Sequence, residues 1–357
     1  MKRVIFAGAG HATLIALDRL ARMKHGAKII LVSDGPSTHY SGMVPGWIEG
    51  IYAGGAMSIP LASFCDARGI RLVDARIEGA DDGCLSTTAG KLPFDHLVLN
   101  LGAVAWRDAA LANSHVVPAK PFDSLIAGLQ TRANASAFAI VGAGPAGLET
   151  AFALRARHPA TGVTVIERGN EILSAFARRF AKRVADRLAA ADISVLTGAE
   201  VAGVDAETVE LADGRRIFSG CTLAFTGAAP PPVLASMPFA RAADGFVAVD
   251  GHMRSLSHPN VLAVGDVATA EADPRPKAGV FSVRSGKPLA DAVAALADGR
   301  TPPPLVLQRR GLVLLSTGGR RAIGVRNGLV AEGRWVWRLK DHFDRSFVDR
   351  FAGPPRR

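Results

Sequence analysis

Short apolar runs recur along the chain, and most of them end in a glycine or a polar turn. Residues 3–8 (RVIFAG) and 138–141 (FAIV) have the pattern of buried strands, and each enters a glycine-rich turn followed by a helical pattern. A second strand is predicted after each helix, at 28–32 and at 163–166. Strands that alternate with helices in this way form parallel sheets, so the pattern predicts an α/β fold with two Rossmann-like dinucleotide-binding domains.

The turn near the middle of the chain has the complete G-x-G-x-x-G spacing. Gly142, Gly144 and Gly147 follow the strand directly, and Pro145 and Ala146 fill the positions between the last two glycines. In a dinucleotide-binding unit the first glycine allows the tight turn, the second lets the backbone approach a pyrophosphate, and the third lets helix and strand pack closely. The helix that follows offers free N–H groups to phosphate, so this turn predicts a nucleotide site.

Glu167 ends the second strand of this unit, 20 residues after Gly147. A carboxylate at this position accepts hydrogen bonds from the ribose hydroxyls and repels a 2′-phosphate, which favours NAD(H). Arg168, the next residue, weakens this preference because an arginine accommodates the 2′-phosphate. The expected electron donor is therefore NAD(P)H, with NADH favoured.

The turn at the start of the chain is a less regular version of the same motif. Gly8 and Gly10 are in place, but Thr13 stands where the third glycine or alanine is usual, and we expect its side chain to push the helix slightly away. At the end of the second strand, Ser33 occupies the ribose position and Asp34 follows one residue later. Either the Ser33 hydroxyl or the Asp34 carboxylate is expected to bind the ribose.

The remaining patterns supply further elements. Residues 38–52 are dense in Gly, Pro and aromatic side chains without helical or strand periodicity, so they form either a ligand-binding loop or a rigid packed one. Phe176, Phe180, Val184 and Leu188 predict a core-facing helix over 174–191. An apolar strand delivers Gly265 and Asp266 to a sheet edge, a helix with small residues follows, and 301–357 contain short strands and a final helix over about 334–351.

Composition narrows the class of protein. The net charge is +10 and the pI is about 10.1, but the basic residues are spread along the chain, so we expect anionic nucleotides rather than nucleic acid as ligands. The three cysteines, Cys65, Cys84 and Cys221, are far apart and form no C-x-x-C motif, and no metal site is predicted. No signal-type segment and no membrane span is predicted, so we expect a cytoplasmic protein.

Two dinucleotide turns followed by a strand-Gly-Asp segment and a helix with small residues at its start resemble the flavoproteins with two dinucleotide-binding domains, the pyridine nucleotide-disulfide oxidoreductase superfamily. Within it, LAVGD, PKAG, Lys120 and the tail TGGRRAIGV…GRWVWRL look most like type II NADH:quinone and sulfide:quinone oxidoreductases. HYSGMVPGWIEGIY, the Lys120-Pro121 segment and WRLKDHFDRSFVDRF look closer still to a subgroup found fused to selenide,water dikinase.

The resemblance implies that the first unit binds FAD and that the second is inserted in it and binds the nicotinamide nucleotide. It implies an FAD-binding domain at 1–121 and 236–300, an NAD(P)H-binding domain at 122–235, and a C-terminal region of α+β type at 301–357. The implied FAD-binding positions are Gly8, Gly10, His11, Ala12, Ser33, Asp34, Ile77, Gly102, Gly265, Asp266, Ala278, Gly279 and Val280. Those for the nicotinamide nucleotide are Gly142, Gly144, Pro145, Ala146, Gly147, Glu167 and Gly227.

The expected function is an FAD-dependent NAD(P)H oxidoreductase in which hydride passes from NADH to flavin and then directly to a small-molecule acceptor such as a quinone. The cysteines match neither a disulfide reductase nor a sulfide:quinone oxidoreductase pattern, so no cysteine redox pair is expected. The glutamines of type II quinone reductases are replaced by Gly279 and by Val283 or Arg284, which argues against a quinone. The alternatives are a sulfur- or selenium-related flavoprotein reductase and a regulatory subunit that binds nucleotide without turnover.

Three residues are candidates for catalysis. Lys277 would place a positive charge near reduced flavin or lie at the surface, Tyr40 or its neighbour His39 would donate a proton, and Pro45 would shape the acceptor face. The final helix presents Trp335, Leu339, Phe343, Phe347 and Phe351 at spacing four beside basic residues. Such a stripe packs on the FAD domain or on a dimer partner, which we favour, or else makes peripheral membrane contact through 335–351 on the cytoplasmic side. The sequence predicts no particular oligomeric state.

Overall fold

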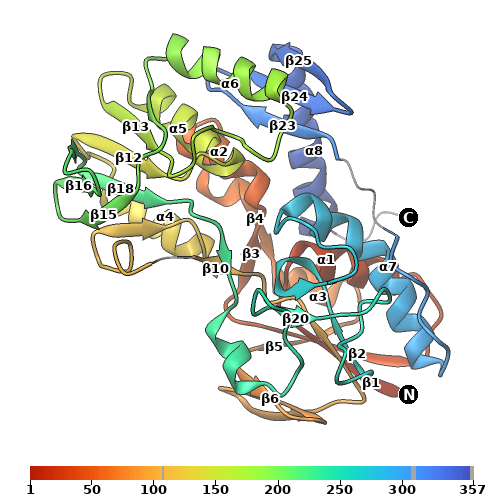
Figure 1. Cartoon of the computed structure of the whole chain (residues 1–357). Helices are drawn as coiled ribbons and strands as arrows, with labels where there is room; N and C mark the ends of the chain where they lie inside the picture. Colours follow the sequence, from red (N-terminus) through yellow and green to blue (C-terminus); the bar gives the residue numbers. More distant parts are fainter. Residues whose placement is uncertain (107, 307–310, 354–357) are drawn as a thin grey trace.

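The computed structural model describes residues 1–106, 108–306 and 311–353 (Figure 1). Within this part of the chain, two parallel sheets of five strands each carry the fold. The first has the order β21 (Val261–Ala263), β9 (His96–Leu99), β1 (Lys2–Ala7), β2 (Ala27–Ser33), β5 (Arg71–Asp74). The second has the order β11 (Val116–Pro118), β18 (Cys221–Ala224), β12 (Ala137–Val141), β13 (Gly162–Ile166), β14 (Ser194–Leu196). The predicted α/β class with two Rossmann-like units is confirmed.

Both units share one plan because their sequences share one pattern. Central strands β1 and β12 are almost entirely buried, as expected for apolar runs covered on both faces of a parallel sheet. In each unit a glycine turn leads to a helix, α1 (His11–Leu20) or α5 (Pro145–Arg157), and then to the neighbouring strand. Each unit also contains an antiparallel three-stranded sheet: β6 (Ile77–Ala80), β7 (Cys84–Thr87), β8 (Gly90–Pro93) in the first and β15 (Val201–Val204), β16 (Thr208–Leu211), β17 (Arg216–Phe218) in the second.

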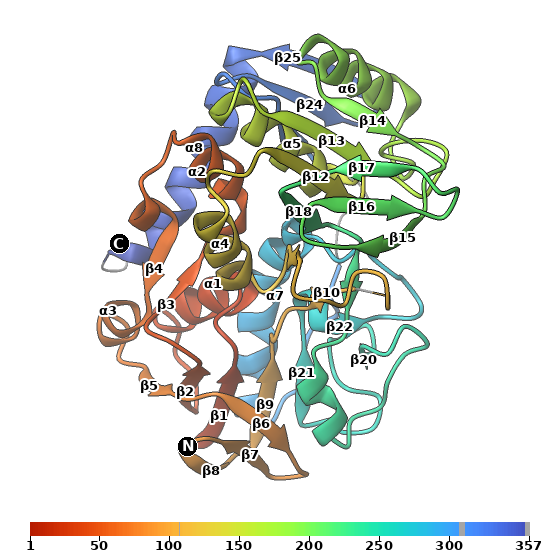
Figure 2. The ribbon, with the colours of Figure 1, turned by 90° about the vertical axis from the view of Figure 1, so that its left-hand side faces the viewer.

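Two short strands join the units. β10 (Val104–Ala105) leaves the first unit, β19 (Ala228–Ala229) returns to it, and the two pair antiparallel. Gly102 and Gly227, each at positive φ, stand before these strands, so the chain turns sharply at both crossings. Figure 2 shows β10 between the two sheets.

The second sheet begins earlier than the expected boundary at residue 121. Val116–Pro118 form β11, which pairs with β18 of the second sheet, because an apolar Val-Val pair fits beside that buried strand. Residues 116–121 therefore go with the second unit. Helix α4 (Phe122–Thr131) follows and packs on β11.

The segment at 38–52 contains more regular structure than its sequence pattern indicates. Ser41–Met43 form a 3-10 turn (η1) and Val44–Glu49 form a short helix, α2, that packs on α5 of the second unit. Pro45 stands in the first turn of α2, where its missing N–H costs nothing. Strands β3 (Ser37–His39) and β4 (Ser58–Pro60), a 3-10 turn (Gly54–Met57, η2) and helix α3 (Leu61–Asp66) complete the segment between β2 and β5.

The chain re-enters the first unit after β19. It passes in order through η3 (Pro232–Ser236), β20 (Val247–Ala248), β21, η4 (Gly265–Val267) and β22 (Ala268–Thr269). β20 and β22 pair with each other, and the long helix α7 (Gly279–Ala297) follows. α7 lies along α1, and they approach so closely at Gly286 that a Cβ there would lie 2.5 Å from the Ile15 Cβ. This contact closes the first unit around its sheet.

The C-terminal region bridges both units. Strands β23 (Val313–Ser316), β24 (Ala322–Arg326) and β25 (Leu329–Gly333) form an antiparallel sheet beside α5 and α6 (Arg178–Ala190), and α8 (Arg334–Ala352) runs back onto the first unit. α6 begins four residues later than predicted, but Phe180, Val184 and Leu188 are buried as expected. No helix among the described residues is long and apolar enough to cross a membrane.

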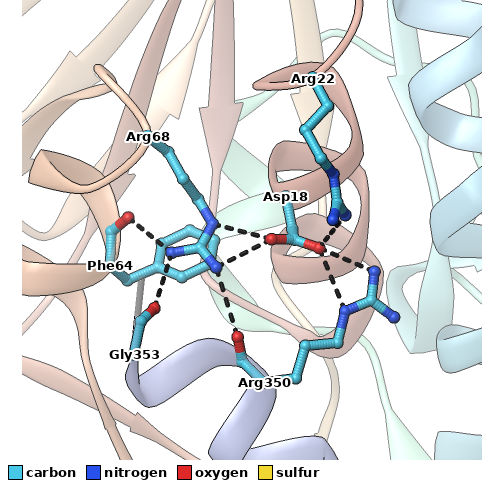
Figure 3. A network of polar contacts seen from close by, with 6 residues as sticks. All are labelled: Asp18, Arg22, Phe64, Arg68, Arg350 and Gly353. Carbon is cyan, nitrogen blue, oxygen red and sulfur yellow. Dashed lines mark hydrogen bonds and ion pairs between the residues drawn. The ribbon is translucent and has the colours of Figure 1, made fainter. Parts of the chain in front are cut away.

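A buried carboxylate attaches the end of α8. Asp18 of α1, 1% exposed, accepts hydrogen bonds from Arg68 and Arg350, and Arg22 pairs with it as well (Figure 3). Burial would raise the pKa of Asp18, but the hydrogen bonds from Arg350 and Arg68 outweigh it and the pKa is lowered. The Arg68 side chain also donates to the Arg350 and Gly353 carbonyls, so one cluster fixes α1, α3 and α8 together.

The predicted aromatic stripe of α8 does not lie on one side of the helix. Phe351 is fully buried against Phe64, and Phe347 stacks on Tyr40, whereas Trp335 and Phe343 are 59% and 48% exposed. Residues at spacing four rotate by about 40° per step on an α-helix, so the stripe turns from solvent to core along its length. The packing alternative is confirmed for its C-terminal half.

Candidate functional site

The glycines of the second turn have the local geometry that the motif spacing predicts. Gly142 has φ +107°, and a Cβ there would lie 2.4 Å from the Phe225 carbonyl oxygen. A Cβ on Gly147 would lie 2.2 Å from the Gly142 oxygen, because helix α5 presses on the turn. Gly144 has open space, so the backbone there is accessible to a phosphate. Pro145 and Ala146 form the first turn of α5, as the motif requires.

Glu167 lies at the carboxyl end of β13 and faces this turn. Its carboxylate accepts hydrogen bonds from the Ala143 N–H at 2.8 Å and from the Gly169 N–H at 2.7 Å. The acidic group therefore stands beside the loop that would hold a pyrophosphate, where the fingerprint places it. Arg168 is exposed next to it.

The first turn is completed by a residue that the motif does not predict. A Cβ on Gly8 would lie 2.5 Å from the Asn100 carbonyl oxygen, and one on Gly10 would lie 2.7 Å from the Asn100 amide. The Asn100 amide donates to the Val264 carbonyl at 3.2 Å and accepts from the Thr13 N–H and hydroxyl, each at 3.1 Å. Thr13, fully buried, is thus held against the end of β9 by hydrogen bonds. The Asn that ends the apolar run HLVLN is the sequence signal for this contact.

Asp266 stands where the chain returns to the first unit, in η4. Gly265 before it has φ +72°, and a Cβ there would lie 2.9 Å from both the Asn100 side-chain amide and the Ser282 hydroxyl. The Asp266 carboxylate pairs with the Lys120 ammonium at 2.5 Å. Lys120 was not among the predicted site residues, although the sequence places it beside a proline in the crossover. An ion pair therefore connects the start of the second unit to the returning chain.

His11, the first residue of α1, lies against the start of α7. A Cβ on Gly279 would lie 3.6 Å from the His11 Nδ1 and 3.8 Å from the Ser41 hydroxyl. Burial lowers the pKa of His11 to about 4, while Asp266 raises it and Lys120 lowers it, so the imidazole is neutral at physiological pH. Ala278 precedes the first turn of α7, which contains Gly279 and Val280, so the predicted positions on α1 and α7 are brought together.

The other predicted positions of the first unit surround the carboxyl ends of its strands. Ser33 is half-buried at the end of β2, Asp34 is exposed one residue later, and the Gly35 N–H donates to Asp74 of β5. Ala12 is fully buried in α1. Ile77 begins β6 and pairs with Thr87.

Two of the three predicted catalytic residues, Lys277 and Pro45, make contacts within the fold. The Lys277 ammonium donates to the Ala268 carbonyl and the Thr269 hydroxyl, both at 2.6 Å, and lies over the Phe246 ring. Burial lowers its pKa, and Asp244 and Asp266 oppose this shift. Pro45 is buried at the start of α2. The fold therefore holds the Lys277 ammonium in place, and its role as a positive charge near reduced flavin stays a prediction. Pro45 lacks the exposed face that its proposed role requires.

Tyr40 lies close to the cofactor positions. Its ring centroid is 5.1 Å from that of His11 and 4.3 Å from that of Phe347, and its hydroxyl hydrogen-bonds to Asp344 of α8. Its neighbour His39 instead pairs with exposed Asp123 at 3.2 Å. Sequence reasoning missed Asp344, Lys340 and Glu149, which form a charged group beside Tyr40. The signal is a Lys and an Asp at spacing four on the α8 face that carries Val336.

The three cysteines are free thiols on different elements: Cys65 in α3, Cys84 in β7 and Cys221 in β18. Burial raises the pKa of Cys65 to about 12 and that of Cys221 to about 11. Both thiols are therefore protonated and poor nucleophiles at physiological pH.

Two parallel sheets that each carry a nucleotide turn, joined by a pair of crossing strands, define a flavoprotein with two dinucleotide-binding domains. The chain belongs to the pyridine nucleotide-disulphide oxidoreductase family, whose model matches residues 2–286. It is an NAD(P)H-dependent flavin oxidoreductase, and its cofactors are FAD and NAD(P)H.

Similar proteins agree with this assignment. An NADH dehydrogenase-like protein of Mycobacterium tuberculosis is 28% identical over 329 residues, 81% of this chain and 78% of its own. The sulfide:quinone oxidoreductase of Aquifex aeolicus has the same fold, with a TM-score of 0.84 at 18% identity over 99% of this chain and 92% of its own. The water-forming NADH oxidase of Lactobacillus brevis has a TM-score of 0.76 at 16% identity, over 91% of this chain and 75% of its own.

Proposed function

We propose that the chain oxidises NADH and passes the electrons through FAD directly to a small-molecule acceptor such as a quinone, without a cysteine pair. The observation that carries this proposal is the pair of nucleotide turns, each at the carboxyl edge of its sheet. A Cβ on Gly8, Gly10, Gly142 or Gly147 would lie 2.2–2.7 Å from another atom of this protein. Both turns therefore pack so closely against the rest of their units that only glycine fits.

The residues of the first unit fit FAD. Gly8, Gly10 and His11 would hold its pyrophosphate, Asp266 would hold the ribityl chain, and Ala278, Gly279 and Val280 would face the flavin ring with the positive end of α7. When bound, FAD takes up hydride from the nicotinamide and returns two electrons to the acceptor. The task of the protein is to orient both nucleotides, and Gly142, Gly144, Gly147 and Glu167 would hold the NADH.

The dispersal of the cysteines supports direct transfer to the acceptor. They occupy three different elements, and those at 65 and 221 are buried with raised pKa values. Among the described residues, no two cysteines therefore lie on one element, and the buried Cys65 and Cys221 thiols stay protonated. The names of the similar proteins, NADH dehydrogenase-like and sulfide:quinone oxidoreductase, suggest a quinone as the first acceptor to test.

We also propose that the exposed end of α8 makes peripheral contact with a membrane that holds the acceptor. Trp335 and Phe343 are exposed there, Arg338 stands between them, and Leu329 on the adjacent β25 is 79% exposed. Aromatic and aliphatic groups beside a cation are the side chains that insert at a lipid surface.

One assay tests both proposals. NADH oxidation is measured with a water-soluble quinone, with a long-chain quinone in anionic liposomes, and with oxygen or polysulfide, before and after Cys84→Ser substitution. We expect both quinones to accelerate NADH oxidation, C84S to have no effect, and Trp335→Ser with Phe343→Ser to slow only the liposome assay. Turnover with polysulfide alone would instead favour a sulfur-related reductase, and no turnover with any acceptor would favour a regulatory subunit.

A further inference from the structure

A buried ion pair lies beside Tyr40, outside the predicted nucleotide-binding positions. The Lys340 ammonium donates to the Asp344 carboxylate at 2.7 Å and to the Gly42 carbonyl at 2.6 Å. Lys340 and Asp344 are 8% and 5% exposed, so α8 brings both charges out of water one turn apart. The desolvation free energy of a buried ion pair can exceed its Coulombic stabilisation, so the position of this pair needs an explanation.

A second carboxylate acts on the same lysine. Glu149, two residues after the last glycine of the nicotinamide turn, accepts a hydrogen bond from the Ser316 N–H at 2.8 Å. Burial raises the pKa of Glu149, which Lys340 opposes and Asp344 reinforces. Burial likewise raises the pKa of Asp344, against Lys340 and with the help of Asp341. Burial would lower the pKa of Lys340, but Glu149 and Asp344 outweigh it and the pKa is raised.

The charges in this group do not balance when every member is ionised. Two carboxylates share one ammonium in a region of low dielectric, where an unpaired negative charge is costly. The group is therefore most stable with one additional proton, held on Asp344 or Glu149. When this proton leaves, one carboxylate is unpaired again, so the group takes up another proton from solvent.

Tyr40 connects this group to the flavin side. Its hydroxyl hydrogen-bonds to Asp344, its ring stacks on Phe347 at 4.3 Å, and its ring lies 5.1 Å from that of His11. A Cβ on Gly42 would lie 2.7 Å from the Tyr40 ring and 2.9 Å from the Asp344 Oδ1, so the tyrosine is fitted tightly to the carboxylate. Burial and Asp344 raise the pKa of Tyr40, so the hydroxyl stays protonated and passes a proton on only as it receives another.

The overall reaction requires one proton besides the hydride. NADH yields two electrons and one hydrogen, so reduction of an acceptor A follows NADH + H⁺ + A → NAD⁺ + AH₂. Resting on the proposed function, we propose that Asp344, Lys340 and Glu149 form a proton reserve that supplies this H⁺ through the Tyr40 hydroxyl. Each turnover breaks one carboxyl O–H bond and forms one O–H bond on the acceptor, and the reserve is refilled from solvent.

A role of this group in proton supply is distinguished from a purely structural role by comparing an acceptor that needs protons with one that does not. Ferricyanide takes single electrons and no proton, whereas a water-soluble quinone takes two electrons and two hydrogens. With the FAD-loaded full-length protein, we expect Asp344→Asn and Tyr40→Phe to lower quinone turnover by at least about tenfold, since a positioned acid contributes on the order of 10²–10⁴-fold. Ferricyanide turnover should stay within about twofold of wild type.

The control variant is Asp341→Asn. Asp341 lies on the same helix and accepts a hydrogen bond from the Tyr52 hydroxyl at 2.6 Å, so it belongs to a matched Tyr–Asp pair outside the reserve. D341N should leave both assays unchanged at low pH, and because Asp341 helps to raise the pKa of Asp344, it should move the alkaline fall of quinone turnover to lower pH. Wild-type quinone turnover should fall as pH rises through the raised carboxyl pKa, because the reserve then loses its proton, and this limb should disappear in D344N.

Three outcomes decide the proposal. Equal slowing of the quinone and ferricyanide assays in D344N would show a structural role, and unchanged quinone turnover in D344N would show that the proton comes from elsewhere; either result overturns the proposal. If wild-type protein reduces neither acceptor with NADH, the proposed function itself fails, and that failure is visible before any variant is made.

Discussion

At the scale of single residues, we propose that Glu167 sets the nucleotide preference of the second unit. Its carboxylate is fixed by the Ala143 and Gly169 N–H groups, so it presents a defined negative charge beside the glycine turn. A ribose 2′-phosphate would be repelled by that charge, whereas the hydroxyls of NADH would donate to it.

Glu167→Gln is expected to lower the ratio of kcat/KM for NADH to that for NADPH by about tenfold, equivalent to about 1.4 kcal/mol. The ratio is measured in steady-state assays with ferricyanide, and it is insensitive to loss of folded protein. Glu171→Gln, an exposed neighbour paired with Arg178, should leave the ratio unchanged. A ratio unaffected by E167Q would mean that Glu167 only braces the turn.

The glycine roles were predictable because each follows from local chain geometry, as the φ of Gly142 and the contact of Gly147 show. Asn100 was not predictable as a partner of Thr13, since that contact joins residues 87 positions apart. The same applies to Glu149 and Lys340, which meet only after the C-terminal sheet has folded against α5. The hydrogen bonds of the Lys277 ammonium to Ala268 and Thr269 were likewise not predictable, because no local sequence pattern indicates them.

At the scale of elements, the attachment of α8 decides whether Phe347, Lys340 and Asp344 reach the site. Asp18 anchors the C-terminal end of the helix through Arg68 and Arg350, and the Arg68 side chain is fully buried. The aromatic stripe alone is compatible with either packing or membrane contact of α8, because periodicity indicates an apolar surface without indicating what covers it. The charged anchor, made by residues 18, 68 and 350, lies outside any local pattern.

Asp18→Ala is expected to lower the free energy of unfolding by about 3–5 kcal/mol, because it leaves the Arg68 guanidinium buried without its carboxylate. Asp186→Ala, which breaks an exposed i,i+4 pair with Lys182 on α6, should cost less than about 1 kcal/mol. Urea unfolding of both variants measures the difference. A D18A variant as stable as D186A would show that apolar packing, and not the ion cluster, holds α8.

At the scale of the whole molecule, two similar units face each other across paired crossover strands, and the C-terminal sheet and α8 lock them together. The two-unit plan was predictable because strand and helix periods and glycine turns are local properties. The extent of the second sheet was not predictable, because β11 joins this sheet by pairing with β18, which lies more than a hundred residues later in the chain. We propose that this architecture places an NAD(P)H site and an FAD site in one chain, which is the central claim.

Anaerobic rapid mixing of the FAD-loaded protein with NADH tests that claim most directly. The account predicts that the visible absorbance of bound flavin is lost within one turnover, that NADPH acts more slowly, and that addition of a quinone restores the oxidised spectrum. A flavin that stays oxidised in excess NADH would contradict the account.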